Sequence, residues 1–405
     1  MNTKNLVIGI VVVIVIVVAA YFALQGGAGA QEIKVGALYN IGGFMGSIDA
    51  PAANGVKLAV KQINEAGGIN GKKIKLILID TKSDQTETAA AAKRLVQEGV
   101  VAMIGYGDTN FARIAGEIAQ ANKIPFITSG ATHPLLPQWV GNYMFLAAFG
   151  DNAQAAAVAE YAVKKLGYKK VVVWVDVEMD FSRAVCTYFV DAFKHYTGDP
   201  NSIVYIDTFH TNDKDYSAQI ARLKDKMKSE KIDAIYIGAT PGNVGLIIKQ
   251  IRDAGIDLPI LGEDGFDTPE MVKVAGKAAE GTIFATHVSL DVPPNDRVKK
   301  FIEAYQKEYG RKPENAFAAL GYDAMMLLAE AIKKAGSTDP TAIKNALEQI
   351  KGFPAVTGTI TYSPQSHVPQ KAVSVLQVKN GKFVTLEQLT PEYMPPAELA
   401  LNPIP

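Results

Sequence analysis

Two short loops, each at the end of an expected strand, are rich in small and hydroxyl-bearing residues. They are Gly105-Tyr106-Gly107-Asp108-Thr109-Asn110, just before an expected helix, and Thr128-Ser129-Gly130-Ala131-Thr132. In open parallel sheets, ligands bind at the carboxyl ends of strands, where helix N-termini present free N–H groups and partial positive charge. Both loops therefore suit a small anion such as a carboxylate. Ordinary helix capping and turn formation are the alternative explanation of the same residues.

A third strand end carries acidic residues instead. Glu263 and Asp264 follow an expected short strand and precede Gly265-Phe266. A carboxylate at this place either lies in a solvated turn or acts as the counter-charge for the ammonium group of a ligand. We keep both interpretations open from spacing alone.

Motifs of known enzymes and metal sites are missing from the sequence. Gly105-Tyr106-Gly107 lacks the third glycine of a dinucleotide-binding loop, and the glycine-rich run 42–46 lacks the Lys-Ser/Thr ending of a P-loop. There is no G-x-S-x-G nucleophile elbow, and the five histidines show no metal-binding spacing. Cys186 is the single cysteine, which excludes an internal disulfide and a cysteine-based metal site. We expect no enzymatic activity, no cofactor and no metal.

Composition limits the partners and the number of domains. The 405 residues contain 41 Lys+Arg and 41 Asp+Glu, so the formal net charge is zero. Binding to nucleic acid requires clustered positive charge, and the balance argues against such a partner. At about 150 residues per domain, the length predicts two or three domains.

The first thirty residues form an export segment. Leu6–Leu24 is an uncharged apolar run that, as a helix, would be about 28 Å long, close to the ~30 Å hydrocarbon core of a bilayer. Ala28-Gly29-Ala30 resembles a signal-peptidase site, so residues 1–30 are either a cleaved signal peptide or an N-terminal membrane anchor. The length favours the anchor. Lipid attachment through an N-terminal cysteine is excluded, because this region has no cysteine.

Beyond this segment, apolar strands alternate with amphipathic helices in two successive runs. In the first run the pattern predicts strands at 33–38, 75–80, 101–104 and 124–127 and helices at 51–66, 85–97 and 109–121. After a bridge at 143–151, it predicts helices at 152–166, 182–196, 216–229 and 242–254 and strands at 170–175, 203–209, 234–238 and 259–262. Strict alternation with near-continuous apolar strands predicts parallel sheets covered by helices on both faces, hence two doubly wound α/β lobes.

The end of the chain departs from this alternation. A strand at 281–286 precedes three helices at 295–309, 316–335 and 340–350, and short strand-like pieces follow at 359–362, 371–378 and 382–386. No third βα run exists here. We therefore expect the chain to return to the first lobe for its helices and to cross again to the second lobe for these strands. The five prolines in 391–405 predict an irregular tail.

From about Glu32 to Leu389 the chain resembles the solute-binding proteins of ABC importers for branched-chain amino acids. The most specific segment is the run Ile63-Asn64-Glu65-Ala66-Gly67-Gly68-Ile69-Asn70-Gly71-Lys72-Lys73. Weaker ones are Ile33-Lys34-Val35-Gly36, Asn54-Gly55-Val56-Lys57-Leu58-Ala59, Ile124-Pro125-Phe126-Ile127-Thr128, Lys214-Asp215-Tyr216-Ser217 and Leu261-Gly262-Glu263-Asp264-Gly265.

The resemblance implies a type I periplasmic binding protein, with two lobes that close on a ligand and a three-stranded hinge. We expect lobe 1 to comprise 32–147 and 286–357, and lobe 2 to comprise 148–285 and 358–390. The crossings are expected near 145–148, 282–286 and 358–360. The family further implies an extracytoplasmic protein that delivers its ligand to ABC permease subunits. We expect a monomer, held at the membrane by its N-terminal segment.

The resemblance also implies ligand-binding residues on both lobes. On lobe 1 they are Thr109, Asn110, Gly130, Ala131 and Thr132, of which Thr132 would donate to the ligand carboxylate through its hydroxyl and backbone N–H. On lobe 2 they are Phe181 as an aromatic lid, Thr240, and Asp264 as the acid that pairs with the ammonium, with Glu263 as its alternative.

This sequence departs from the family at several of these positions. Phe181, Thr240 and Ile48 stand where family members have tyrosine, and each lost hydroxyl bond shifts specificity by about 1 kcal/mol. An aliphatic amino acid is the first choice of ligand, with other amino acids, amides or small carboxylates close behind. A ligand-binding sensor is the alternative function, although no signalling domain follows the lobes in this sequence.

Overall fold

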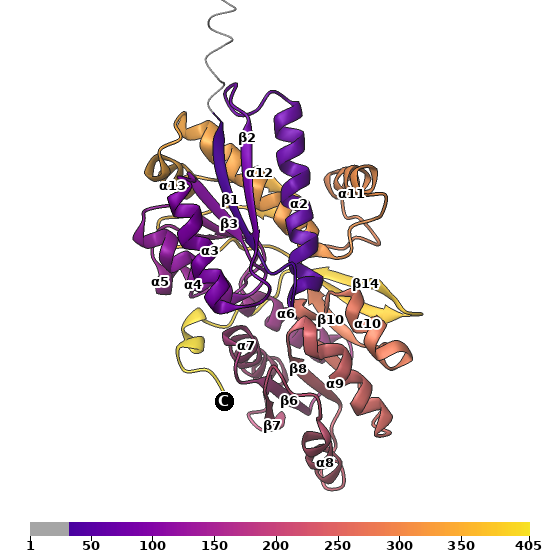
Figure 1. The fold of residues 1–405 in the computed structure, drawn as a ribbon. Helices are drawn as coiled ribbons and strands as arrows, with labels where there is room; N and C mark the ends of the chain where they lie inside the picture. Colours follow the sequence, from indigo (N-terminus) through magenta and orange to yellow (C-terminus); the bar gives the residue numbers. More distant parts are fainter. Residues whose placement is uncertain (1–31) are drawn as a thin grey trace, which may run out of the picture.

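The computed structural model describes residues 32–405, which form two α/β bodies stacked end to end (Figure 1). The predicted export segment lies outside the described residues. Each body contains one large β-sheet covered by helices. We call the two sheets with their packed helices lobe 1 and lobe 2. The predicted fold class, two α/β lobes, is confirmed, whereas the predicted residue boundaries of the lobes stay a prediction.

Lobe 1 is built on a five-stranded parallel sheet in the order β2-β1-β3-β4-β5. Its strands are β1 (Ile33–Tyr39), β2 (Ile74–Asp80), β3 (Ala102–Gly105), β4 (Phe126–Thr128) and β5 (Met144–Leu146). The helices between them are α2 (Gly46–Glu65), α3 (Gln85–Gln97), α4 (Thr109–Ala121) and α5 (Leu136–Val140). The strands are mostly apolar and buried, as expected for a sheet covered on both faces.

Three helices from late in the chain return to lobe 1, as the sequence predicts. They are α11 (Asp296–Tyr309), α12 (Ala316–Ala335) and α13 (Pro340–Glu348), followed by a hairpin of β11 (Phe353–Ala355) and β12 (Gly358–Ile360). Helix α12 packs closely on α2 because glycines stand at the contact. A Cβ atom on Gly321 would lie 2.0 Å from the Ala52 carbonyl oxygen, and one on Gly55 would lie 1.9 Å from that of Ala318.

Lobe 2 has a seven-stranded sheet in the order β14-β13-β10-β9-β8-β6-β7. Its strands are β6 (Val171–Asp176), β7 (Ile203–Phe209), β8 (Ala234–Gly238), β9 (Ile260–Gly262), β10 (Ile283–Thr286), β13 (Val373–Lys379) and β14 (Lys382–Leu389). Its helices are α6 (Asp151–Lys164), α7 (Asp180–Thr197), α8 (Ser217–Lys226), α9 (Pro241–Asp253) and α10 (Pro269–Ala275), with short 3₁₀ turns η1 (Asp264–Phe266) and η2 (Gly276–Ala279).

One edge of the lobe 2 sheet is antiparallel, which differs from the predicted parallel sheet. Strand β13 pairs antiparallel with both β10 and β14. The β13–β14 pairing follows from the two-residue turn Asn380-Gly381, in which both residues have positive φ, 52° and 69°. Such a turn matches the twist of a β-hairpin and returns the chain antiparallel to itself.

A buried lysine ties together the segments that run between the lobes. Lys371 Nζ donates to the carbonyl oxygen of Ala147 at 2.5 Å and to the Thr357 hydroxyl at 2.8 Å. Thr357 is in turn held by Asp323 of α12, whose carboxylate accepts its N–H and its hydroxyl. The junction of the lobes is thus a hydrogen-bonded polar core and not an open linker.

The proline-rich tail packs against lobe 2. It contains a 3₁₀ turn, η3 (Ala397–Leu401), which the sequence did not predict. The Tyr188 hydroxyl donates to the Ala397 carbonyl oxygen at 2.7 Å, and the ring of Tyr393 stacks on His195 at 3.8 Å. The tail therefore covers α7, beside which the C-terminus lies (Figure 1).

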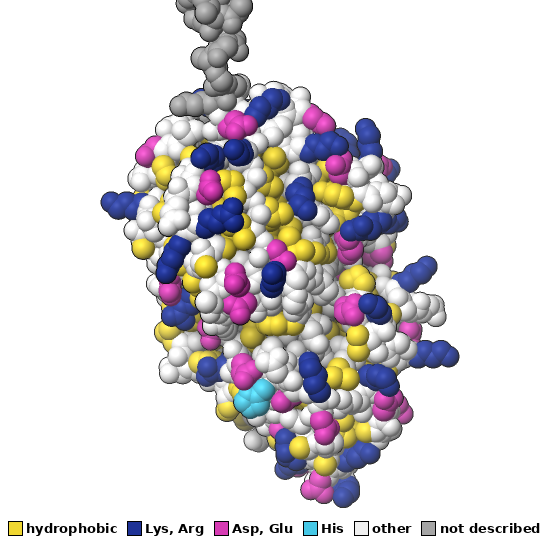
Figure 2. Space-filling model, viewed as in Figure 1, with side chains coloured by type: hydrophobic (Ala, Val, Ile, Leu, Met, Phe, Trp, Pro, Cys, Tyr) yellow, Lys and Arg dark blue, Asp and Glu magenta, His cyan; other side chains and the backbone are white. Residues whose placement is uncertain are grey.

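Basic and acidic side chains are interspersed over both lobes on the face that Figure 2 shows. This mixing agrees with the balanced charge of the sequence. Among residues 32–405, no helix has the combination of length and hydropathy that crossing a bilayer requires.

Candidate functional site

The carboxyl ends of strands from the two lobes face each other across a narrow cavity. Its volume is about 10 Å³, which is room for about one water molecule. The lobes are therefore closed on each other, and a larger ligand enters only when they separate. The lining residues are Met45, Ile48, Gly107, Asp108, Phe181, Thr240, Pro241, Asp264, Gly265 and Phe317.

The first predicted loop, after β3, starts α4. Asp108 caps this helix, and its Oδ1 accepts hydrogen bonds from the backbone N–H groups of Asn110 at 2.8 Å and Phe111 at 3.4 Å. Burial raises the pKa of Asp108 to about 7. Beside it, the hydroxyl of Thr109 is buried and has no hydrogen-bond partner among the described residues. A buried hydroxyl without a partner is costly, so this atom is available to a ligand.

The pKa of Asp108 leads to a prediction about stability. A folded-state pKa above the ordinary aspartate value of 3.8 means that the folded protein binds more protons than the unfolded chain between these two pKa values. The free energy of unfolding therefore falls as the pH rises through this window. Asp108→Asn keeps the capping oxygen and removes the charge. We expect it to raise the free energy of unfolding by about 2 kcal/mol at pH 8 and to leave it unchanged at pH 4.

Denaturant unfolding of both proteins at the two pH values measures this difference. The Asp253→Asn variant, at an exposed acid of lobe 2 that pairs with Lys249, is the control. An equal effect of Asp108→Asn at pH 4 and pH 8 would contradict the assigned pKa.

The second predicted loop, after β4, ends at a buried hydroxyl. Thr132 is 1% exposed, and its hydroxyl lies close enough to the Asp151 carboxylate to oppose the rise of the Asp151 pKa, although it forms no hydrogen bond of good geometry within residues 32–405. The N–H groups of Gly130 and Ala131 are bonded within lobe 1, to the Tyr106 carbonyl oxygen and the Thr128 hydroxyl. Among the backbone donors of this loop, Thr132 N–H has no acceptor in the described part of the chain. Thr132 thus presents a free backbone N–H and, beside Asp151, its hydroxyl; its role in binding a carboxylate stays a prediction.

Gly130 makes room for an aromatic ring that the sequence analysis missed. A Cβ atom on Gly130 would lie 2.8 Å from two carbons of the Phe317 ring. Phe317 belongs to α12, comes to this loop from 187 residues further along the chain, and forms one wall of the cavity.

We expect Gly130→Ala to destabilise the protein by about 1–2 kcal/mol, because the Phe317 ring must shift to admit the methyl group. Adding Phe317→Leu should recover at least half of that loss, since leucine leaves room beside residue 130. Thermal or denaturant unfolding of the two single variants and the double variant measures the coupling. Strictly additive losses would show that the two side chains do not compete for space.

Lobe 2 contributes an apolar wall and an acid. Phe181, at the start of α7, is 8% exposed and lines the cavity, and Thr240 precedes α9. The Thr240 hydroxyl donates to Asn243 Oδ1 at 3.0 Å, so this hydroxyl is already bonded. The lobe 2 wall therefore offers a ligand few polar groups other than Asp264.

Asp264 is held by two donors from other elements. Its Oδ1 accepts from Gln154 Nε2 at 3.0 Å, and His287 Nε2 lies 2.8 Å from its Oδ2. Burial lowers the pKa of His287, so its ring is neutral and donates this hydrogen to the carboxylate. The two bonds fix the carboxylate at the cavity wall. His287 and Gln154 were not predicted, because neither adjoins Asp264 in the sequence.

Glu263, the alternative acid, is turned toward the backbone. Its carboxylate accepts the N–H groups of Ala239 and Gly265, and it does not line the cavity. Burial raises its pKa well above the usual range, with the nearby Asp264 as a further cause. We therefore place the ligand-facing charge on Asp264.

Asp151, at the start of α6, is a further buried acid that the sequence analysis missed. Its backbone N–H donates to the Thr132 carbonyl oxygen at 2.8 Å, and its Oδ1 accepts from Gln154 Nε2. Burial raises its pKa well above the usual value, and the charge of Asp264 adds to this rise. Two acids thus lie close together at this side of the cleft, which favours a positively charged group there.

Asn110 links the lobes instead of lining the cavity. Its Nδ2 donates to the Glu178 carbonyl oxygen at 3.3 Å, and its Oδ1 accepts from the Asp180 N–H at 3.2 Å.

Of the eight predicted residues, Phe181, Thr240 and Asp264 line the closed cavity; Thr109, Gly130, Ala131 and Thr132 lie in the adjoining loops. Their roles in binding stay a prediction. No cluster of metal-ligating side chains occurs among residues 32–405.

Comparison with known proteins identifies the family. The model of the periplasmic binding protein family matches residues 32–382. The chain belongs to this family. Membership implies that the folded part works outside the cytoplasm.

Named relatives cover nearly the whole chain. The Leu/Ile/Val-binding protein homolog 3 of Brucella melitensis is 29% identical over 358 residues, which is 88% of this chain and 94% of the relative. The leucine-specific-binding protein of Salmonella typhimurium is 26% identical over 376 residues, 93% of this chain and 96% of the relative.

Two crystal structures are similar in fold and sequence. The leucine-binding protein LivK of Thermotoga maritima has a TM-score of 0.81 and 33% identity, covering 89% of this chain and 99% of that one. LivJ of Streptococcus pneumoniae, solved in complex with isoleucine, has a TM-score of 0.81 and 32% identity, covering 89% and 100%.

Proposed function

We propose that this protein captures a branched-chain or other aliphatic amino acid between its two lobes and delivers it to the permease of an ABC importer. The observation that carries the proposal is the polarity of the cleft. Lobe 1 offers the unpartnered hydroxyl of Thr109 and the free N–H of Thr132, which suit a carboxylate, and lobe 2 offers the fixed carboxylate of Asp264, which suits an ammonium. Related proteins named for leucine, isoleucine and valine support this choice.

The walls between these two poles favour an aliphatic side chain. Met45, Ile48, Phe181, Pro241 and Phe317 are apolar, and the bonded hydroxyl of Thr240 adds no free donor. Burying an aliphatic side chain against such walls contributes about 1.5–3 kcal/mol. We infer reversible binding without chemical change, because the named relatives are binding proteins.

A thermal-shift screen of the purified protein against the amino acids, their amides and small carboxylates tests the proposal. At 100–1,000 times Kd, a ligand adds about 2.7–4.1 kcal/mol of apparent stability, or about 3–5 °C in a chain of this length. We expect leucine, isoleucine or valine to give this shift. A shift with small carboxylates alone would favour a different solute, and no shift with any amino acid would contradict the proposal.

We also propose that the export segment stays attached as a membrane anchor and that the protein acts as a monomer. The length of the apolar run Leu6–Leu24 supports the anchor. N-terminal sequencing of the exported protein should then begin near Met1. A start at Gln31 would instead identify a cleaved signal peptide.

A further inference from the structure

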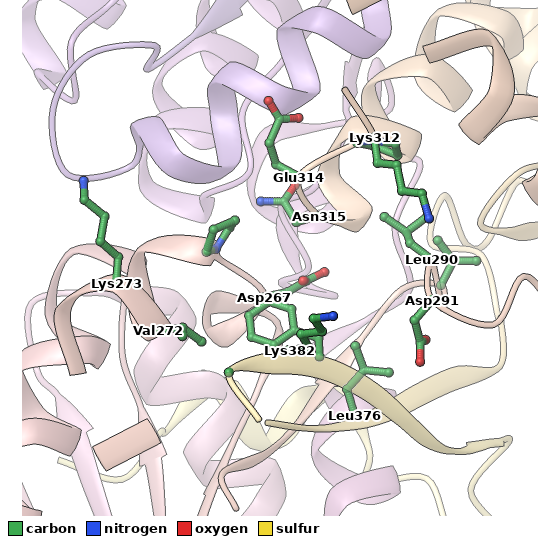
Figure 3. A pocket seen from close by; sticks show the side chains of 15 residues that line it. Asp267, Val272, Lys273, Leu290, Asp291, Lys312, Glu314, Asn315, Leu376 and Lys382 are labelled. Atoms are coloured by element: carbon green, nitrogen blue, oxygen red, sulfur yellow. The ribbon is translucent and has the colours of Figure 1, made fainter. Parts of the chain in front are cut away.

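A second and larger cavity, of about 600 Å³, lies between the lobes beside the cleft described above, and the two share no lining residue. Four parts of the fold enclose it: the η1–α10 region and the β13–β14 hairpin of lobe 2, the segment 312–315 that precedes α12 of lobe 1, and the loop after β10 (Figure 3). Because both lobes supply its walls, the cavity has this shape only while the lobes are closed.

A buried carboxylate points into this cavity (Figure 3). Asp267 is 3% exposed, and its Oδ2 accepts from the Thr286 hydroxyl at 2.6 Å and from the Ala316 N–H at 3.0 Å. Both of these bonds are made by Oδ2, and Oδ1 takes part in neither. The neighbouring Asn315 is 1% exposed and lines the cavity, and its Oδ1 is unpartnered in residues 32–405. The floor of the cavity, formed by the buried residues Asp267 and Asn315, thus presents hydrogen-bond acceptors and no free donor.

Two exposed lysines at the rim have no acidic partner. No acid within residues 32–405 pairs with Lys312 or Lys382, although both line the cavity. Of the two acids at the rim, Glu314 pairs with Arg311, whereas Asp291 accepts from the Ser289 and Thr385 hydroxyls and keeps its negative charge. The rim thus carries two unpaired lysines and one unpaired carboxylate, a net positive charge, above the acceptors of Asp267 and Asn315.

The walls between floor and rim are apolar. Val272, Val288, Leu290, Leu376 and Phe383 line this stretch. A ligand that fits would carry a positive donor at one end, a negative group at the other and an apolar body between them. The volume exceeds what one amino acid requires and falls in the range of small-molecule sites.

We propose that this cavity binds a short apolar peptide of two or three residues, with its ammonium on Asp267 and its carboxylate between Lys312 and Lys382. The site is separate from the amino-acid cleft and does not depend on the function proposed for that cleft. Since Asp267 of lobe 2 also holds the Ala316 N–H of lobe 1, a bound peptide favours the closed lobes. Peptide and amino acid should therefore strengthen each other's binding.

Calorimetry with the dipeptide Leu-Leu, its N-acetyl form and its C-terminal amide tests the proposal on the purified protein. We expect one-to-one binding of Leu-Leu and at least tenfold weaker binding of either blocked form. The double variant Lys312→Met/Lys382→Met should bind Leu-Leu at least tenfold more weakly than the unaltered protein does. It should also bind Leu-Leu and its C-terminal amide equally well, while its affinity for the amino acid stays unchanged. Asp267→Asn should bind Leu-Leu and its N-acetyl form with equal affinity.

Asp264→Asn, which alters the amino-acid cleft, separates the two sites. Leu-Leu binding that persists in this variant and is lost in the lysine variant supports the proposal. Binding that disappears in Asp264→Asn but is unchanged in the lysine variant would place the peptide in the cleft and overturn the proposal. Absence of Leu-Leu binding to the unaltered protein would overturn it as well. The lysines are at the rim, so their variant remains informative if Asp267→Asn fails to fold.

Discussion

Asp264→Asn is expected to weaken the binding of the amino-acid ligand at least a hundredfold. The Asp264 carboxylate is 2% exposed and faces a cavity whose other walls are mostly apolar, so a ligand ammonium there has little access to water. Removing one charge of a buried, hydrogen-bonded pair costs about 2–5 kcal/mol, and a hundredfold change in Kd corresponds to about 2.7 kcal/mol. Asparagine keeps the size of the side chain, so the loss reports on charge.

Isothermal titration of leucine, or of the best ligand in the thermal-shift screen, measures this effect. Asp253→Asn is the matched control, because Asp253 is an exposed acid of the same lobe that pairs with Lys249. Thr132→Val should weaken binding about tenfold, through the loss of one hydrogen bond to a charged group. Unchanged affinity in both Asp264→Asn and Thr132→Val would refute the assignment of the two poles.

Lys371→Met is expected to lower the free energy of unfolding by about 3–5 kcal/mol. The lysine is 6% exposed and donates to Ala147 and Thr357, next to the buried carboxylate of Asp323. Burial lowers the pKa of Lys371 to about 8, partly opposed by Asp323. The ammonium is thus charged at pH 7, and removing it leaves Asp323 without its counter-charge, which accounts for the size of the loss.

Denaturant unfolding at pH 7 measures the loss, and Lys228→Met is the control. Lys228 lies on the surface, with a side chain 76% exposed, so its replacement should change stability by less than about 0.5 kcal/mol. A loss below about 1 kcal/mol in Lys371→Met would show that the hydrogen bonds at the junction of the lobes contribute little.

Most elements of the fold follow from local patterns in the sequence. Helices α3, α4 and α12 and strand β8 have the predicted bounds, because caps such as Asp84 and Asp108 and the regular apolar spacing determine them locally. The antiparallel pairing of β13 and β14 was missed, although Asn380-Gly381 is a typical hairpin turn. Strand β5 was interpreted as a bridge, since its three residues are too short for a periodic signal.

The site was predictable only in part, because several of its residues come from distant elements. Thr132 and Asp264 follow strands, and that position alone indicates the edge of the sheet where ligands bind. Phe317, Gln154 and His287 reach the same place through the packing of α12, α6 and the segment after β10. The residues next to these three in the sequence do not indicate that they lie at the site. Asn110 was predicted as a ligand residue, but its amide is bonded across the lobes.

The most direct test of the account is a crystal structure of the purified protein grown with leucine. The account predicts one leucine between the lobes, with its ammonium within hydrogen-bond distance of Asp264 and its carboxylate within hydrogen-bond distance of Thr132. A leucine bound with these ends reversed, or bound outside the cleft while the cleft stays empty, would contradict it.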